Sequence, residues 1–218
     1  IMRNILRSLL LVIMACCAYT GNAQRGAIGF HATVAEYDGD LNGNQHHYYQ
    51  FSDPKLGGSF SLQQYLNPSF NLVEKFSFNR VNYQNSDNTV GFKSNIFALN
   101  LTLKYKFNNG YIFNEDAAIA PFIVAGIGAT RINSQVDTNL SDATIVNDIY
   151  DANLAVGAGI LFQFNDRVGL EVANTINSPL NDTWDGVDEG RNDLYFQHSA
   201  GLIFSLRKPA DTDLDGVA

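Results

Sequence analysis

Apolar and polar residues alternate with a period of two in several segments of the chain. The clearest segment covers residues 97–107, where every second side chain is large and apolar and most of the others are small, polar or basic. Alternation with this period predicts a β-strand whose two faces meet different surroundings. Eleven residues is also the length that a tilted strand needs to cross a bilayer.

The same pattern, read along the whole chain, predicts eight strands. It is again clear in residues 154–164, where the smaller residues of the second face include Ala155, Gly157 and Gly159. The expected strands are residues 27–37, 56–66, 70–83, 97–107, 118–132, 154–164, a strand beginning at 168, and 194–206.

The connections between these segments differ in length in a regular way. Residues 67–69 and 165–167 are tight turns built from turn-forming residues, and residues 108–117 are somewhat longer. The remaining connections are long and polar, at residues 38–55, 84–91, 133–151 and 177–192. Short turns at one end and long loops at the other are typical of outer-membrane barrels. The pattern predicts an all-β fold, an eight-stranded antiparallel up-and-down transmembrane β-barrel with extracellular long loops and both termini in the periplasm.

Aromatic residues are expected to form a belt at each end of this barrel. The periplasmic belt would contain Tyr65, Phe70, Tyr105, Phe107, Phe162, Phe164 and Phe204. The extracellular belt would contain Tyr83, Phe92, Phe97, Tyr150, Tyr195 and Phe196.

Alternation alone does not separate a membrane barrel from a soluble, lipocalin-like barrel with an apolar interior. Composition favours the membrane, because the chain is 45% hydrophobic and only 17% charged, against about 25% charged in a typical soluble domain. The non-apolar faces are rich in small and polar residues, which suit the narrow interior of an eight-stranded barrel. Lys75, Lys104, Lys106 and Glu171 would then point inward, and we predict that Lys104 and Glu171 share one lumenal network.

One strand fits this pattern poorly. Glu74 shares the apolar face of residues 70–83 with Phe70, Leu72 and Phe76. A carboxylate facing lipid costs free energy, and the cost falls near the interface. Either Glu74 lies close to the periplasmic head groups, or a bulge shifts the register of the strand.

The N-terminal segment has the features of a secretory signal peptide. Two arginines flank the start of a ten-residue apolar run, which is too short to span a bilayer as a helix. Small residues at Gly21 and Ala23 then fit a cleavage site, so residues 1–23 are expected to be removed. Both cysteines of the chain, Cys16 and Cys17, would leave with them. The alternative is lipidation of Cys16, whose preceding residues resemble a lipoprotein processing site.

Four motifs resemble the OmpA-type eight-stranded barrels, particularly those of Bacteroidetes. Residues 37–41 are similar to the Y-x-G-D-L at the end of that family's first strand, and residues 121–128 to its P-Y-x-x-x-G-x-G motif. Residues 199–206 match the C-terminal strand pattern by which barrels are recognised for insertion. Residues 211–217 resemble the start of a thrombospondin-type-3-like repeat. The resemblance implies a barrel at residues 24–207 and a periplasmic acidic linker at 208–218, the beginning of a truncated repeat.

The linker also contains the candidate metal ligands. Asp211, Asp213 and Asp215, followed by Gly216, have the spacing of the first ligands and the turn glycine of a calcium loop. The acidic ligand at position twelve of such a loop is not in the sequence given. A solvated acidic linker is the alternative interpretation. We expect no cofactor besides this candidate calcium ion.

Other chemistry-bearing residues carry weaker indications. His198 and Ser199 suggest a hydrolase, but adjacent strand residues point to opposite faces and cannot form a nucleophile–base pair. His46 and His47 in the first long loop could bind a metal, although loop histidines are usually only solvated. Gly126 and Gly128 lie within a strand and do not form a phosphate-binding loop. The sequence does not decide whether Trp184 recognises a ligand or anchors the barrel at the head groups.

The sequence therefore predicts a non-catalytic structural barrel of the bacterial outer membrane. By resemblance, it would anchor a periplasmic, peptidoglycan-binding region or serve as a subunit of a larger outer-membrane assembly. A small ligand-binding or channel-forming barrel is the alternative, and a lipid A-modifying enzyme is the third class. Outer-membrane lipid, and peptidoglycan through a further domain, are the expected partners. The net charge of −8 argues against a nucleic-acid partner.

Overall fold

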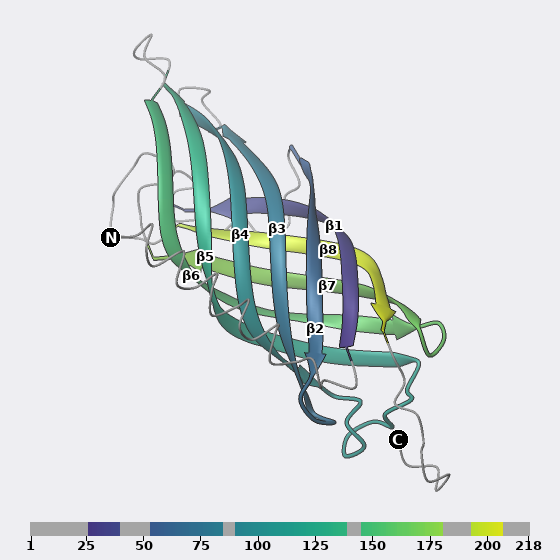
Figure 1. Cartoon of the computed structure of the whole chain (residues 1–218). Coiled ribbons are helices and arrows are strands. Elements are labelled where there is room, and N and C mark those ends of the chain that lie inside the picture. Colours follow the sequence, from purple (N-terminus) through teal and green to yellow (C-terminus); the bar gives the residue numbers. More distant parts are fainter. Residues whose placement is uncertain (1–25, 40–52, 85–89, 139–144, 181–192, 207–218) are drawn as a thin grey trace, which may run out of the picture.

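The described part of the chain forms one closed β-barrel. The computed structural model describes residues 26–39, 53–84, 90–138, 145–180 and 193–206. The strands in these ranges are β1 (Gly26–Asp38), β2 (Leu56–Tyr65), β3 (Phe70–Gln84), β4 (Val90–Lys106), β5 (Ile119–Thr138), β6 (Ile145–Gln163), β7 (Val168–Pro179) and β8 (Leu194–Ser205). Each pairs antiparallel with its neighbour in the chain, and β1 pairs with β8 to close the barrel (Figure 1). This confirms the predicted fold class and strand count.

Two asparagines shape the tightest connections. The Oδ1 atom of Asn67 accepts hydrogen bonds from the backbone N–H groups of Ser69 and Phe70. Asn165 does the same for Arg167 and Val168 between β6 and β7. These side chains replace backbone partners within the turn, which is why asparagine favours such positions. The end of the barrel with these turns is called the short-turn end below, and the opposite end the long-loop end.

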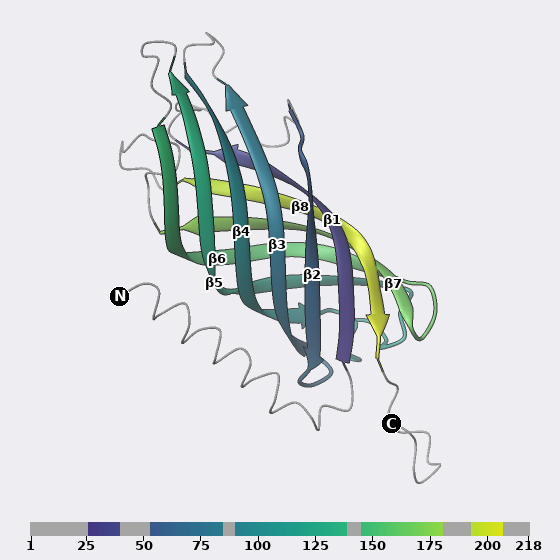
Figure 2. The same ribbon diagram turned by 45° about the horizontal axis from the view of Figure 1, so that its top comes forward.

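The strands are longer than predicted on one side of the barrel. β4, β5 and β6 contain 17, 20 and 19 residues, whereas β1, β2, β7 and β8 contain 10 to 13. The expected loop at residues 133–151 is wrong, because β5 and β6 continue to pair as far as Val136 and Ile145. Figures 1 and 2 show this hairpin reaching beyond the shorter strands. Hydrophobic alternation does not predict such an extension, because beyond the membrane neither face needs to be apolar.

Large apolar side chains cover the outside of the barrel. Examples with two-fifths or more of their surface exposed are Leu103, Ile123, Ile127, Val156, Leu202 and Phe30. Leu99 and Leu101 share this outward face and are half-buried, and Ile160 is exposed. Their chain neighbours point inward and are buried, among them Asn100, Thr102 and Lys104. The barrel is therefore apolar outside and largely polar inside, the reverse of a soluble barrel. No helix in the described ranges is long and apolar enough to cross a membrane.

Glycine permits a close approach between two strands. A Cβ atom on Gly126 in β5 would overlap the backbone of Leu101 and Thr102 in β4. The Gly126–Gly128 segment is paired strand throughout, as the sequence predicted. Its function is packing in a narrow barrel.

Candidate functional site

The lumen of the barrel contains a buried charge network centred on Glu171. One carboxylate oxygen of Glu171, in β7, lies 2.5 Å from the Lys104 ammonium, which projects from β4 on the opposite side of the barrel. The other oxygen lies 3.5 Å from Nε2 of His31 in β1. The Gln63 amide joins the pair, because its Nε2 donates to Glu171 and its Oε1 accepts from Lys104, both at 3.2 Å. The predicted Lys104–Glu171 network is confirmed.

Further lumenal groups extend this network. Lys104 also lies over the ring of Phe122, with 3.9 Å between Nζ and the ring centroid. Lys75 points inward, as predicted, and donates to the Ser199 hydroxyl at 3.3 Å. Buried charges of this kind are stabilised only when their partners are well placed. Side chains from seven of the eight strands therefore take part in this network.

A layer of amides lies beside the charges. Asn153 donates to the Oδ1 atoms of Asn100 and Asn177, and Asn100 donates to Asn177, at 2.8 to 3.3 Å. Asn79 accepts from Thr33 at 2.7 Å and donates to Gln197 at 2.9 Å. Four of these five bonds join strands that are not neighbours in the sheet, and the bond from Asn153 to Asn177 joins the adjacent β6 and β7. A small cavity of about 30 Å³ lies among these polar groups.

The lumen becomes apolar towards the long-loop end. A cluster of buried side chains fills it there: Ala35, Tyr37, Val81, Phe92, Ile96, Ile132 and Tyr195, with Tyr83 and Ile149 packed against them. The rings of Tyr37 and Phe92 meet edge to face with centroids 4.8 Å apart.

This cluster corrects the aromatic belt that was predicted for the long-loop end. Tyr83, Phe92 and Tyr195 point inward and close the lumen. Phe97 and Tyr150 do face outward and are exposed. The prediction was wrong for the three residues because it used their position along the strand and not their parity.

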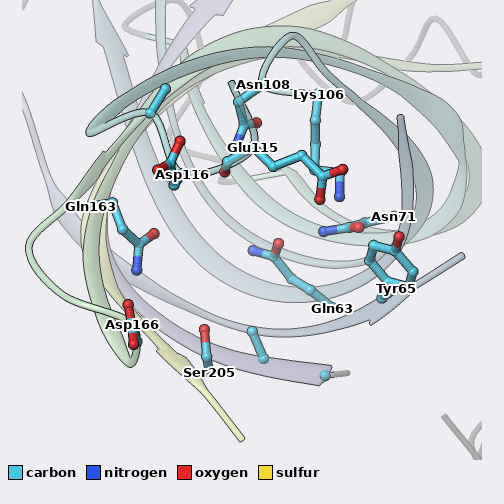
Figure 3. A pocket seen from close by; sticks show the side chains of 13 residues that line it. Gln63, Tyr65, Asn71, Lys106, Asn108, Glu115, Asp116, Gln163, Asp166 and Ser205 are labelled. Carbon is cyan, nitrogen blue, oxygen red and sulfur yellow. Dashed lines mark hydrogen bonds between the residues drawn. The ribbon is translucent and has the colours of Figure 1, made fainter. Parts of the chain in front are cut away.

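The short-turn end of the lumen opens into a polar vestibule. Its volume is about 420 Å³, and Figure 3 shows its lining side chains arranged around the opening. Amide groups of Gln63, Asn71 and Gln163 line it together with acidic residues on the turns. Lys106 reaches the same opening, with its ammonium 4.7 Å from the centre of the Tyr65 ring. The vestibule could hold a small polar molecule, and the buried charge network lies behind it.

Glu74 lies on the outward face without any bulge. The pairing of β3 with β2 and β4 is unbroken on both sides of it, which excludes a shifted register. Its carboxylate is buried among neighbouring side chains and accepts a hydrogen bond from Nε2 of Gln64 at 3.3 Å. Gln64 is one residue from the end of β2, so the pair lies towards the short-turn end.

The structure separates His198 from Ser199, as the sequence argument required. His198 faces outward and lies 2.9 Å from Glu36. Ser199 faces inward and donates to the carbonyl oxygen of Ala173 at 3.3 Å. They form no nucleophile–base pair. The contact between His198 and Glu36 was not predicted, because it crosses the β1–β8 closure and joins residues that are 162 apart in sequence.

Several predicted sites fall outside the described residues. These are the signal peptide at residues 1–23 with Cys16, the loop residues His46, His47 and Trp184, and the linker aspartates Asp211, Asp213 and Asp215. The calcium site remains a prediction. Within the ranges that the structure covers, no cluster of three or more His, Cys, Asp or Glu residues could hold a metal ion.

Solved structures with the same architecture include several outer-membrane barrels. Ail, the attachment invasion locus protein of Yersinia pestis, aligns with a TM-score of 0.52 and 11% identity over 84% of this chain and 98% of Ail. Ail in complex with the heparin analogue sucrose octasulfate gives 0.51 and 10%, over 83% and 97%. A major outer membrane protein from Thermus thermophilus gives 0.51 and 9%, over 83% of this chain and 99% of its own.

The fold is that of an outer-membrane β-barrel. At these identities the likeness extends to the fold alone. No protein-family model matches the sequence, and no curated protein matches it. The features of this chain that bear on its function are therefore its lumen and its outer wall.

Proposed function

We propose that this protein is a non-catalytic structural barrel of the bacterial outer membrane. The observation that supports this most directly is the filled lumen, which is closed by an apolar cluster at one end and by a cross-linked polar network in the middle. The apolar outer wall would anchor the barrel in lipid, while the closed ladder satisfies the backbone polar groups. Long loops would face the outside, and both chain ends the periplasm.

The proposed role of the barrel is to anchor a periplasmic region joined to the C-terminal end of β8. The acidic linker resembles a repeat that joins such barrels to peptidoglycan-binding domains, so a link between membrane and cell wall is the favoured function. Service as a subunit of a larger outer-membrane assembly is the other form of this proposal. Calcium at Asp211, Asp213 and Asp215 would stiffen the linker. Cosedimentation with isolated peptidoglycan tests the link, comparing the natural full-length protein with residues 24–207 alone.

Ion conductance tests the closed lumen. The purified barrel, reconstituted in a planar bilayer, is expected to show no conductance or only small and rare openings. Steady, large openings in most insertions would contradict a structural plug. Protection of the strands from protease in liposomes shows that the barrel has inserted, so that failure to insert is not mistaken for a closed lumen.

The vestibule favours a second candidate, a ligand-binding barrel. It is open, about 420 Å³ in volume, and lined by amides and charges that could bind a small polar ligand. Equilibrium binding of soluble cell-wall fragments, with the vestibule variant Asn71→Leu for comparison, tests it. Binding that the substitution abolishes would support this candidate over a purely structural role.

A further inference from the structure

The charges of the lumenal network do not balance. Among its described residues, the ammonium groups of Lys75 and Lys104 face one carboxylate, that of Glu171. Lys104 and Glu171 form the buried ion pair described above. Within the described part of the chain, the one hydrogen bond of the Lys75 ammonium is to the neutral hydroxyl of Ser199. The network therefore has one excess positive charge, and a second one if His31 is protonated.

An excess charge in these surroundings costs free energy. A buried ion is stabilised when an opposite charge or several hydrogen bonds replace the water that it has lost. Glu171 is already shared, because one of its oxygens contacts Lys104 and the other lies 3.5 Å from the ring of His31. Lys75 is partly buried, and its ammonium has three N–H groups, of which Ser199 accepts one. A further negative charge beside Lys75 would therefore stabilise the network.

A small cavity lies at the place where this charge is needed. Its volume is about 30 Å³, and both Lys75 and Lys104 line it. Asn100 lies directly opposite Lys75 in the pairing of β3 with β4, and it lines the same cavity. Among the described residues, Glu171 is the one carboxylate in the lining, and the other polar groups there are amides and hydroxyls. The lining is thus rich in groups that can donate hydrogen bonds to an anion.

The size of the cavity favours a small occupant. Pockets for organic ligands usually measure about 300 to 1,000 Å³, roughly ten times the volume of this cavity or more. A water-sized particle fits in such a space, and a chloride ion is little larger than a water molecule. Water brings no charge, so a small anion satisfies both the size and the charge of the site.

We propose that the lumen binds one halide ion, chloride in the natural setting, in the cavity between Lys75 and the amide of Asn100. The excess positive charge of the network attracts the ion, and the neighbouring N–H groups replace its water. Gln63 borders both the cavity and the vestibule, so an ion in the vestibule would enter the network at this side chain. The inference goes beyond the proposed anchoring role and holds whether or not the barrel is joined to the cell wall.

The dependence of unfolding on chloride measures this binding. An anion that binds only the folded barrel stabilises it, and above the dissociation constant the unfolding equilibrium constant falls about tenfold for each tenfold rise in anion concentration. The full chain is unfolded with urea in neutral detergent micelles. Sodium chloride replaces sodium isethionate, whose anion is much larger, at constant ionic strength. We expect stabilisation of this size by chloride, and also by bromide.

Matched variants locate the site. Lys75→Met deletes the excess charge and should abolish the chloride dependence. Asn100→Asp balances the charge with a fixed carboxylate opposite Lys75 and should abolish the dependence as well, so the test stands even if one of the two variants does not fold. Lys93→Met removes an exposed lysine and should leave the dependence unchanged. Heat-modifiable gel migration shows which variants are folded barrels.

Bromide also shows where the ion binds. In crystals of the unaltered chain grown in sodium bromide, the anomalous signal should place one ion in the lumen beside Lys75. Three outcomes would overturn the proposal. The first is unfolding that does not depend on chloride, which would mean that the cavity holds water or that Lys75 is uncharged. The others are a dependence that persists in the folded Lys75→Met or Asn100→Asp variant, and a bromide map without a lumenal ion.

Discussion

The barrel has two ion pairs of similar chemistry in opposite surroundings. Lys104 and Glu171 meet inside the lumen with side chains 4% and 8% exposed. Arg131 and Asp148 meet on the outside of the β5–β6 hairpin, 3.0 Å apart, with side chains 45% and 41% exposed. The exposed pair has the better geometry, because two guanidinium nitrogens contact both carboxylate oxygens. Burial, more than geometry, is expected to decide how much the barrel depends on each pair.

The physical reason is the medium around the charges. Water screens an exposed pair and solvates either partner when the other is removed, so such pairs contribute little. Inside the lumen there is little water, so a charge whose partner is removed depends on the buried groups that remain, such as His31 and Gln63 beside Glu171. We therefore expect folding to depend more on the lumenal pair than on the pair at the hairpin.

Loss of the lumenal ammonium should have the largest effect. Lys104→Met leaves the Glu171 carboxylate without its nearest cation, which should lower the free energy of unfolding by about 3 kcal/mol or more. Urea-dependent unfolding in micelles measures it. A double-mutant cycle with Glu171→Leu should give a large coupling energy. A change below about 1 kcal/mol for Lys104→Met would show that the lumen solvates its charges as water does.

Truncation in the apolar cluster tests the other part of the lumen. Ile96 is fully buried there, and Ile96→Ala should cost about 2 to 3 kcal/mol through lost burial and a residual cavity. The same substitution at the exposed Ile127 removes a side chain from the lipid-facing wall and leaves no internal cavity. Equal losses at the two positions in the same micelles would contradict the assignment of an internal core.

Substitution of the outward carboxylate should have a smaller effect. Glu74→Gln keeps a group that can hydrogen-bond with Gln64, so we expect a change within about 1 kcal/mol. Unfolding at neutral pH measures it, with Gln64→Leu as the companion variant. A loss comparable with that of Lys104→Met would mean that Glu74 has an essential ionic partner.

The exposed ion pair should matter least. Arg131→Met is expected to change stability by less than about 1 kcal/mol, and added salt should reduce even that. A double-mutant cycle with Asp148 measures the coupling directly. A coupling energy as large as that of Lys104 and Glu171 would show that burial does not decide how much each ion pair contributes to stability.

Much of the barrel could be predicted from the sequence because hydrocarbon imposes one strong rule. Within the wall, successive side chains of a strand face lipid and lumen in turn. This alternation alone predicts that Lys104 and Glu171 point inward. Beyond the wall this rule no longer holds, so it does not predict the extension of β5 and β6. Position along the strand predicts that Phe92 and Tyr195 join a membrane belt, whereas their parity places them in the lumen, in the apolar cluster.

Contacts across the barrel closure could not be predicted in this way. Glu36 and His198 meet only because β1 pairs with β8 in one particular register. A shift of one residue would move every side chain of a strand to the other face. Local alternation gives no information on which residues of distant strands lie opposite each other. The contact between Glu36 and His198 could therefore be found only in the structure.

Quenching by lipid tests whether hydrocarbon surrounds the outer wall of the barrel. The cysteines of the chain, Cys16 and Cys17, lie in the predicted signal peptide, so single cysteines can be labelled in the barrel. Fluorophores at Leu101, Ile160 and Leu202 should be quenched by brominated lipid chains, while one at Gln163, which lines the vestibule, should not. If none of the four fluorophores is quenched, and the chain stays monodisperse without detergent, water and not hydrocarbon surrounds the wall.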